Sequence, residues 1–415
     1  MSSVGEQLSP CRPLRLLASH ASPSVAACGR RATALLRVCM LAMLAFAGVA
    51  CSDRPSVVVY VSADEAFARP ILAEFERTSG VRVDAVFDTE ATKTTGLANR
   101  LRAERDRPRA DVFWSSENVQ TILLAEEGVL APASSEGLGA WPAEHRDAQG
   151  RWYAFAARAR VIVVARDRVP KEEWPTTWME LTQDRWAGRV AMADPRFGTT
   201  RTHMGVLATE WERRLMPGAF GAWLEGLGEQ RVALLTSGNA GVVEAVASGQ
   251  FDVGMTDTDD VWAAQARGMA VELIYPRHVE GDEPQGGTLL IPNTCALVAR
   301  PTTDASDRRH AIALMEYLLS AEVERALLAS DSRNIPLAPA LAEEAKAWLP
   351  PDPLRVDWSR AAPAAEEASN RAAAVLRAAL ERKPPVGRVV PSDTEHEADA
   401  EKAVEDATSA AGSGR

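Results

Sequence analysis

The sequence predicts an α/β protein of two lobes, with a cleft between them and two strands that cross from one lobe to the other. Three observations support this. Apolar, β-branched segments alternate with segments of helix length over most of the 415 residues. A long apolar stretch, residues 152–165, leaves the first series of such units and starts a second one. Strand character then returns late, at residues 287–298, so we expect the chain to cross back to its first lobe.

The first series of units occupies residues 57–127. Its strand candidates are apolar runs without polar alternation, which are typical of strands buried on both faces of a parallel sheet. Its first helix candidate places Phe67, Ile71 and Phe75 at helical spacing and ends at Gly80. We therefore expect a mostly parallel sheet with helices on both faces. The predicted strands are 57–61, 81–87 and 111–114, and the predicted helices are 64–79, 90–104 and 117–127.

The second series follows the same rhythm and extends to residue 298. Its predicted strands are 189–193, 232–235, 251–255, 271–275 and 287–298, and its predicted helices are 200–215, 240–248 and 260–268. Further helices are expected within 305–329 and over 361–382. From this order we predict lobe 1 over residues 57–152 and 276–345, lobe 2 over 153–275, and a C-terminal helical extension over 346–382.

The two ends of the chain differ from the rest. Residues 1–50 carry a basic stretch and then a short apolar run, the layout of an export signal, and the run is too short to span a bilayer comfortably. The segment 48–51, GVAC, resembles the lipobox of bacterial lipoproteins, which implies that Cys51 is lipidated and begins the mature chain. The alternatives are cleavage without lipidation, or a misplaced start that adds extra leader. Residues 383–415 are acidic and poor in apolar residues, so we expect a disordered tail.

Composition excludes several classes of protein. The 46 Lys and Arg residues are outnumbered by 57 Asp and Glu residues, and this net charge of −11 has the wrong sign for a surface that binds nucleic acid. Five cysteines are too few for a disulfide scaffold. The 46% of hydrophobic residues excludes a wholly disordered chain.

Polar residues gather where predicted strands end and helices begin, which is where open α/β sheets bind ligands. After the first-lobe strands these residues are Ser62, Asp64, Glu65, Ser115, Ser116 and Glu117; in the second lobe they are Gly198, Thr199, Thr200, Asn239, Asp257, Thr258, Asp259 and Asp260. The glycine and hydroxyls of 198–200 at a helix start suit an anion, and the acidic group at 257–260 suits a cation. Asp64, Ser115, Ser116 and some of the aspartates at 257–260 can instead be helix caps.

At this point the chain resembles a known family, the periplasmic substrate-binding proteins of bacterial ABC importers, in the ferric-iron-binding branch of the type II fold. The likeness covers residues 57–340. It is carried by VVVYVS at 57–62, DTEATKT at 88–94, ADVFW at 110–114, EEGVLAP at 126–132, FGTT at 197–200 and GTLLIPN at 287–293. The resemblance implies an extracytoplasmic protein that closes its lobes on a solute and passes it to a permease and an ATPase in the inner membrane.

The resemblance also implies a ligand set. Ferric-binding relatives typically hold iron with two neighbouring tyrosines, often a His and a Glu, and an anion that completes the shell. Here the positions of the tyrosine pair carry Asp259 and Asp260, and the first-lobe positions carry Glu65 and Glu117. Gly198, Thr199, Thr200 and Asn239 match the anion loops, to which we add Ser62, Asp64, Ser115, Ser116, Asp257 and Thr258 as ligand-binding candidates.

The missing tyrosines leave two cargoes open. Carboxylates are hard oxygen donors, so Glu65, Glu117, Asp259 and Asp260 could hold ferric iron with an anion as the transported ligand. The same acids could bind an ammonium group while 198–200 holds a phosphate, which makes a phosphonate, phosphate or phosphorylated metabolite the alternative.

We do not expect catalysis. The sequence has no nucleophile elbow and no paired metal-binding histidines, so a secreted hydrolase or transferase is the weaker hypothesis. A sensor subunit that signals through the acidic tail is a third. The expected location is the periplasm or the outer face of the cytoplasmic membrane, with a lipid anchor on Cys51.

Overall fold

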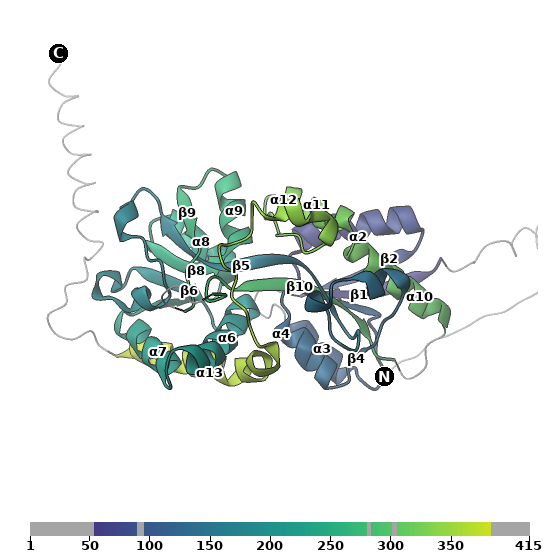
Figure 1. The fold of residues 1–415 in the computed structure, drawn as a ribbon, viewed down its shortest axis with the longest axis horizontal. Helices are drawn as coiled ribbons and strands as arrows, with labels where there is room; N and C mark the ends of the chain where they lie inside the picture. The colour runs from purple at the N-terminus through teal and green to yellow at the C-terminus, as the bar shows by residue number, and fades with distance from the viewer. Residues whose placement is uncertain (1–53, 89–94, 280–283, 301–304, 383–415) are drawn as a thin grey trace, which may run out of the picture. The chain divides into compact units, whose positions relative to one another are not determined.

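The computed structural model describes residues 54–88, 95–279, 284–300 and 305–382 (Figure 1). The expected α/β class is confirmed within these ranges. The strands are β1 (Ser56–Val61), β2 (Arg82–Phe87), β3 (Val112–Ser115), β4 (Leu130–Ala131), β5 (Tyr153–Ala165), β6 (Val190–Ala193), β7 (Ala233–Leu235), β8 (Val253–Asp257), β9 (Val271–Ile274) and β10 (Leu290–Val298). The export signal, Cys51 and the acidic tail lie outside the described residues.

Helices cover this sheet along most of the chain. The longest are α6, α13 and α2, and the predicted positions of all three agree with the structure to within a few residues. They are α2 (Glu65–Ser79), α3 (Thr95–Ala103), α4 (Val119–Glu126), α5 (Glu136–Ala140), α6 (Gly198–Arg214), α7 (Ala219–Glu229), α8 (Gly238–Ala247), α9 (Thr258–Ala266), α10 (Ala305–Leu318), α11 (Ala321–Ala329), α12 (Ala342–Ala345) and α13 (Trp358–Glu381). The sequence reading did not predict α7.

The strands form one hydrogen-bonded path in the order β2-β1-β3-β10-β5-β8-β6-β7, with β4 beside β10 and β9 beside β5. We call β1, β2, β3, β4 and β10 the first strand group, and β6, β7, β8 and β9 the second. Neighbours are parallel within β2-β1-β3 and within β7-β6-β8, but every pairing that involves β5 or β10 is antiparallel. The parallel sheet expected for the first series is confirmed in β2-β1-β3, and the two crossing strands, β5 and β10, run antiparallel to their neighbours.

The crossing strand β5 joins the two groups. All thirteen of its residues are buried. Its first part pairs with β10, and residues 160–165 pair with β8 and β9. Ala156 has a φ of +43° near the point where the pairing with β10 shifts register, so the strand bends there. The two predicted crossing strands are thus confirmed as β5 and β10, whereas the predicted lobe boundaries stay a prediction.

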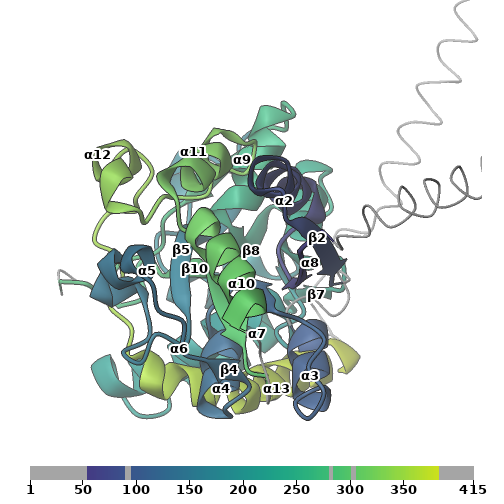
Figure 2. The same ribbon diagram turned by 90° about the vertical axis from the view of Figure 1, so that its right-hand side faces the viewer.

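Each strand group is packed between helices. On the first group, α10 and α11 cover one face through Leu314, Leu318 and Leu327, whereas α3 and α4 cover the other. On the second group, α6, α7 and α13 lie on one face and α8 and α9 on the other. Figure 2 shows α10 lying along the first group between α5 and α2. Among the described residues, no helix combines the length and the hydropathy that crossing a bilayer requires.

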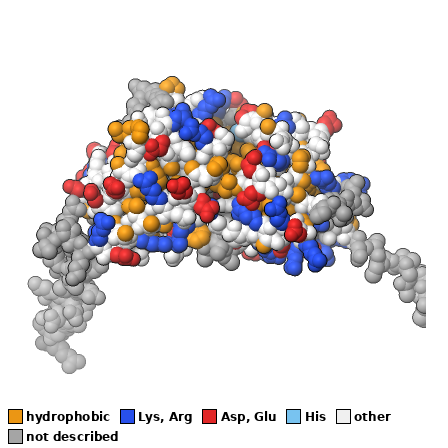
Figure 3. All heavy atoms as spheres, turned by 90° about the horizontal axis from the view of Figure 1, so that it is seen from below, with side chains coloured by type: hydrophobic (Ala, Val, Ile, Leu, Met, Phe, Trp, Pro, Cys, Tyr) orange, Lys and Arg blue, Asp and Glu red, His pale blue; other side chains and the backbone are white. Residues whose placement is uncertain are grey.

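The last described helix, α13, packs against both parts of the fold. It lies against α6 and α7 and also contacts α4, where Ala362 and Ala365 pack on Val119. On the face of the molecule seen from below in Figure 1, where α13 lies, Figure 3 shows charged side chains of both signs mixed with scattered apolar ones. The helix therefore packs on the rest of the fold, and the predicted C-terminal extension over 346–382 stays a prediction.

The crossing of α6 and α13 depends on Gly205. A Cβ at this position would lie 2.6 Å from the carbonyl oxygen of Ala361 and 2.8 Å from Cα of Ala365. We expect Gly205→Ala to lower the free energy of unfolding by about 1–3 kcal/mol, because the two backbones must separate. Denaturant unfolding checks this. Gly139→Ala, where a Cβ meets nothing within 4 Å, is the matched control, and equal losses in both variants would contradict the close approach.

Two buried histidines pair inside the core of the second group. His278 Nδ1 lies 2.9 Å from the carbonyl oxygen of Gly287, and the Nε2 atoms of His203 and His278 lie 3.0 Å apart. If His278 donates its Nδ1 proton to Gly287, its Nε2 accepts the proton of His203, so both rings are neutral. Burial, aided by the neighbouring Arg160, lowers the pKa of His278 to about 3, and burial also lowers that of His203.

This pair should make the fold sensitive to acid. The unfolded chain takes up protons on these rings near their ordinary pKa of about 6.5, whereas the folded chain does not, so the free energy of unfolding should fall as the pH drops from about 6.5 towards 3. We expect His278→Asn to flatten part of this pH dependence, measured by denaturant unfolding at a series of pH values. His310→Asn, on α10, is the control, and identical profiles for His278→Asn and the parent would refute the assignment.

Candidate functional site

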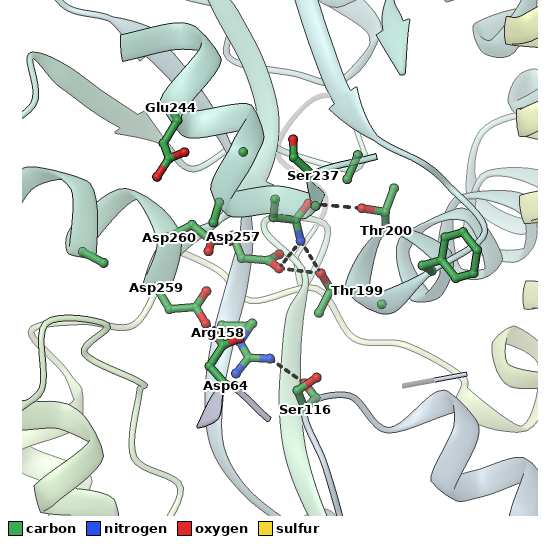
Figure 4. A pocket seen from close by; sticks show the side chains of 18 of the residues that line it. Asp64, Ser116, Arg158, Thr199, Thr200, Ser237, Glu244, Asp257, Asp259 and Asp260 are labelled. Carbon is green, nitrogen blue, oxygen red and sulfur yellow. Dashed lines mark hydrogen bonds and ion pairs between the residues drawn. The ribbon is translucent and has the colours of Figure 1, made fainter. Parts of the chain in front are cut away.

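A cavity of about 510 Å³ opens between the carboxyl ends of strands from both groups. It is lined by the loop after β1, the loop after β3, strand β5 and the first turns of α6, α8 and α9. This is the place where parallel strands end and helix N-termini begin, as the sequence predicted. The lining includes Asp64, Glu65, Ser116, Arg158, Gly198, Thr199, Thr200, Ser237, Asn239, Glu244, Asp257, Asp259, Asp260 and Arg267 (Figure 4).

The charge of the lining is negative. Six carboxylates line the cavity against two guanidinium groups. Glu65 is paired with Arg69 on α2, on the exposed side of that helix, and Glu244 lies 3.8 Å from Arg267. The remaining acids are Asp64 from the first group and Asp257, Asp259 and Asp260 from the second, so both sides of the cavity contribute negative charge.

Helix α6 begins at the cavity with Gly198, whose φ of +54° is a conformation that glycine adopts readily. No side chain caps this end of the helix, and the N-cap residue is Phe197. The first N–H groups of a 17-residue helix therefore face the cavity with the positive end of its dipole. The hydroxyls of Thr199 and Thr200 donate to Asp257 and Asn239, so the N–H groups are the donors that this turn offers. This turn can accept an oxyanion.

Asp257, the last residue of β8, is fully engaged by its neighbours. The buried Arg160 on β5 donates from Nη1 to Asp257 Oδ1 at 3.0 Å. Asn239 Nδ2 donates to Oδ2 at 2.8 Å, and the Thr199 hydroxyl donates to the same oxygen. The carboxylate thus ties the starts of α6 and α8 to the crossing strand.

A second arginine of β5 reaches the other side of the acidic group. Arg158 Nε lies 2.8 Å from Asp259 Oδ2, and the two side chains are about nine-tenths buried. Nη1 donates to the carbonyl oxygen of Ser116 at 2.6 Å. Figure 4 shows Asp64 and Asp259 both close to this guanidinium group. Arg158 therefore bridges α9 of the second group and the β3–α4 loop of the first.

Three aspartates form a potential cation site. Single carboxylate oxygens of Asp257, Asp259 and Asp260 all lie within 4.8 Å of one another. Asp257 and Asp259 are buried, and Asp260 is half-buried with Oδ2 3.4 Å from the hydroxyl of Thr256. Carboxylate oxygens at this spacing can share a hard cation once their present partners give way. The group lies at the start of α9 because β8 extends to Asp257, two residues further than predicted.

Four predicted site residues do not line the cavity. The hydroxyl of Ser62 donates to Asp88, that of Ser115 accepts from the N–H of Glu117, and that of Thr258 accepts from the N–H of Ala159. Ser115 thus bonds the local backbone, Ser62 bonds an acidic side chain, and Thr258 ties the start of α9 to β5. Glu117 is the fourth.

Glu117 is buried away from the cavity. Its carboxylate accepts hydrogen bonds from the N–H groups of Val119 and Gln120, at the start of α4, and from the hydroxyl of Thr202 on α6 at 2.7 Å. Burial raises its pKa. Its position in the sequence suggested a metal ligand, but this side chain caps its own helix and links α4 to α6.

Sequence reasoning missed Arg158 and Arg160. Both lie in the 13-residue segment YAFAARARVIVVA, in which all the residues except the two arginines and Tyr153 are apolar or small. Charged side chains are almost never fully buried unless they are paired, and residues two apart in a strand share a face. That pattern could have identified a charged floor. Tyr153 and Tyr275, in contrast, donate to backbone carbonyls outside the cavity.

Asp257 has three hydrogen-bond partners and is buried, whereas Asp260 is half-buried, and this difference can be tested. We expect Asp257→Asn to lower the free energy of unfolding by about 3–5 kcal/mol, because it leaves the buried Arg160 uncompensated. Asp260→Asn should cost less than about 1 kcal/mol, since Asp260 is half-buried. Urea unfolding of both variants checks this, and similar losses would refute the structural role of Asp257.

The chain is similar in sequence to known periplasmic proteins. The chain is 26% identical over 213 residues to the "Fe(3+)-binding periplasmic protein" of Serratia marcescens, which covers 51% of this chain and 60% of that protein. It is 23% identical over 281 residues to the "Major ferric iron-binding protein" of Neisseria meningitidis, covering 66% and 78%. The chain thus spans less than two thirds of the Serratia protein. Both relatives are named as binding proteins.

Solved structures show the same fold. The crystal structure of iron-bound HitA from Pseudomonas aeruginosa superposes with a TM-score of 0.60 at 21% identity, covering 78% of this chain and 99% of that one. Apo ferric ion-binding protein A of Pasteurella haemolytica gives 0.64 at 20% identity, covering 77% and 97%. The type II periplasmic binding protein fold is confirmed. The family model for bacterial extracellular solute-binding proteins matches residues 108–360, and the chain belongs to that family.

Proposed function

We propose that this chain is the solute-binding component of an ABC importer and that its cargo is ferric iron, bound together with an anion. The observation that carries the proposal is the group of Asp257, Asp259 and Asp260 in a negatively charged cavity between the two strand groups. A hard trivalent cation prefers oxygen donors of this kind. The relatives named as ferric-binding proteins support the same cargo.

The ligand set differs from the tyrosine pair that the family resemblance implies. In this proposal Asp259 and Asp260 supply the oxygen ligands in place of phenolates, and Asp64 approaches from the first strand group. Glu117 is not among the ligands, because its carboxylate is already committed to α4 and Thr202. The anion binds at the start of α6, where the first N–H groups of the helix, at residues 198–200, line the cavity.

Closure of the two lobes on the cargo would complete the site and create the surface that a permease recognises. In this proposal the chain is a non-catalytic binder that works with a permease and an ATPase of the inner membrane. We further propose that it is exported and held at the membrane by lipid on Cys51, outside the described residues.

Metal analysis tests the cargo. Protein purified without chelator and loaded with ferric iron should bind one equivalent, and both Asp259→Ala and Asp260→Ala should lower the affinity at least tenfold, because each removes an oxygen ligand. Glu343→Gln, an exposed acid on α12, is the control and should bind like the parent. Failure of the parent protein to bind iron, with or without added phosphate, would refute the proposal.

The alternative cargo is a phosphonate, phosphate or phosphorylated metabolite. The observation that favours it is Arg158, since a guanidinium group in the cavity floor can bind a phosphate oxygen. Metal-free protein that carries stoichiometric phosphorus after purification would decide for this cargo.

A further inference from the structure

We propose that the edge of the first strand group at which β1 and β3 begin is a docking surface for the headgroups of anionic phospholipids. Docked there, the anchored protein holds its cavity away from the bilayer. We call this surface the basic edge, and its arginines are Arg100, Arg102, Arg105, Arg107, Arg109 and Arg300. The inference rests on the lipid anchor at Cys51 that the proposed function includes.

The basic edge lies beside the start of β1. Asp111, which precedes β3, accepts from the N–H of Val58 at 2.8 Å and forms an ion pair with Arg300 at 2.7 Å. Arg300 also donates to the carbonyl oxygen of Arg109 at 3.0 Å. These contacts hold the loop of residues 104–109 at the amino ends of β1 and β3. Figure 3 shows Lys and Arg side chains gathered at the right-hand end of the molecule, the side on which Figure 1 labels β1 and β2.

This edge is positive in a chain that is negative as a whole. Residues 100–111 carry five arginines against three acids, whereas the whole chain has a net charge of −11. Arg105 and Arg107 are exposed, and neither forms an ion pair with an acid within the described part of the chain. The Arg109 side chain is 74% exposed and lies 3.8 Å from Glu104. Guanidinium groups that protein acids leave unoccupied are available for phosphate oxygens, which match their planar geometry.

The anchor keeps this edge close to a membrane. Ser56, the first residue of β1, follows Cys51 by five residues, and a fully extended chain of five residues spans at most about 18 Å. A lipid on Cys51 therefore holds the start of β1 within that distance of the bilayer. Because so short a tether makes docking intramolecular, a few arginines suffice for a contact that would be weak between separate molecules.

The cavity lies at the opposite ends of the same strands. β1 runs from the basic edge towards the cavity over six residues, a length of about 20 Å. The cavity lining holds six carboxylates against two guanidinium groups. An anionic bilayer attracts the basic edge and repels the acidic cavity, so the two forces favour the same orientation. The docked protein therefore turns its cavity to the solution, from which the solute arrives.

The experiment reports how close the basic edge lies to lipid. The full chain is expressed in a bacterium, purified in detergent and reconstituted into phosphatidylcholine vesicles with or without phosphatidylglycerol. A fluorophore is attached to Ala103→Cys, an exposed position on α3, or to Met216→Cys, a 63% exposed position between α6 and α7. Spin-labelled headgroups in the bilayer quench the fluorophore at short range. Cys295 is buried and should not react with the dye.

The expected result is quenching that depends on lipid charge and on position. We expect phosphatidylglycerol to raise the quenching at position 103 by about threefold or more, because several arginines each gain from a negative surface. About 0.5 M NaCl should remove most of this rise, since salt screens exposed charges. The label at position 216, on the second strand group's side, should show no such rise.

Two triple variants assign the effect to the basic edge. Both lose three exposed arginines, so they have the same net charge. The rise at position 103 should disappear in the first variant, which combines Arg105→Gln, Arg107→Gln and Arg109→Gln. It should persist in the second, the matched control, which combines Arg325→Gln, Arg355→Gln and Arg360→Gln.

The outcomes are distinguishable. Lipidated protein that is quenched equally in both kinds of vesicle, or a rise that survives in both triple variants, would overturn this inference alone. Equal quenching is also the result expected if an acidic protein, and not lipid, binds the basic edge. Protein recovered without lipid on Cys51, as determined by mass spectrometry, would overturn the anchor and this inference together. Solute binding is measured separately by iron analysis, so its failure is recognised independently.

Discussion

Two guanidinium groups carried by one buried strand hold the acidic pocket together. Arg158 and Arg160 lie two residues apart on β5. Arg158 pairs with Asp259 at the start of α9, and Arg160 pairs with Asp257 at the end of β8. Without them, three carboxylates within 4.8 Å of one another would repel each other in a largely buried setting. The position of the first turn of α9 relative to the crossing strand thus depends on these ion pairs.

Because of these ion pairs, a solute that binds to the aspartates must first displace the groups with which they are paired. Asp257 is saturated by Arg160, Asn239 and Thr199, so it fixes geometry, whereas Asp259 and Asp260 are the acids whose partners can change. Glu117 is also a structural residue, because its buried carboxylate accepts hydrogen bonds from the backbone of α4 and from Thr202. Acidic residues close together in sequence therefore divide into those that build the pocket and those that can meet a solute.

Much of this could be predicted from the sequence, for a physical reason. Apolar strands followed by amphipathic helices give the α/β class, and the carboxyl ends of parallel strands share one edge, which brings Asp64, Ser116 and Thr199 into one cavity. The sequence could not separate Glu117 from Glu65, since a carboxylate at a helix start caps or binds depending on which way it points. It also hid the antiparallel partners of β5 and β10, because buried strands of either direction have the same apolar pattern.

The place of β10 in the sheet affects how fast the chain folds. This strand, residues 290–298, inserts between β3 and β5, which both end more than a hundred residues earlier in the sequence. During synthesis, the edges of β3 and β5 that pair with β10 stay without hydrogen-bond partners until this late segment has been made. Such high contact order slows folding, so the newborn polypeptide stays unfolded for longer and its strand edges are exposed to aggregation during that time.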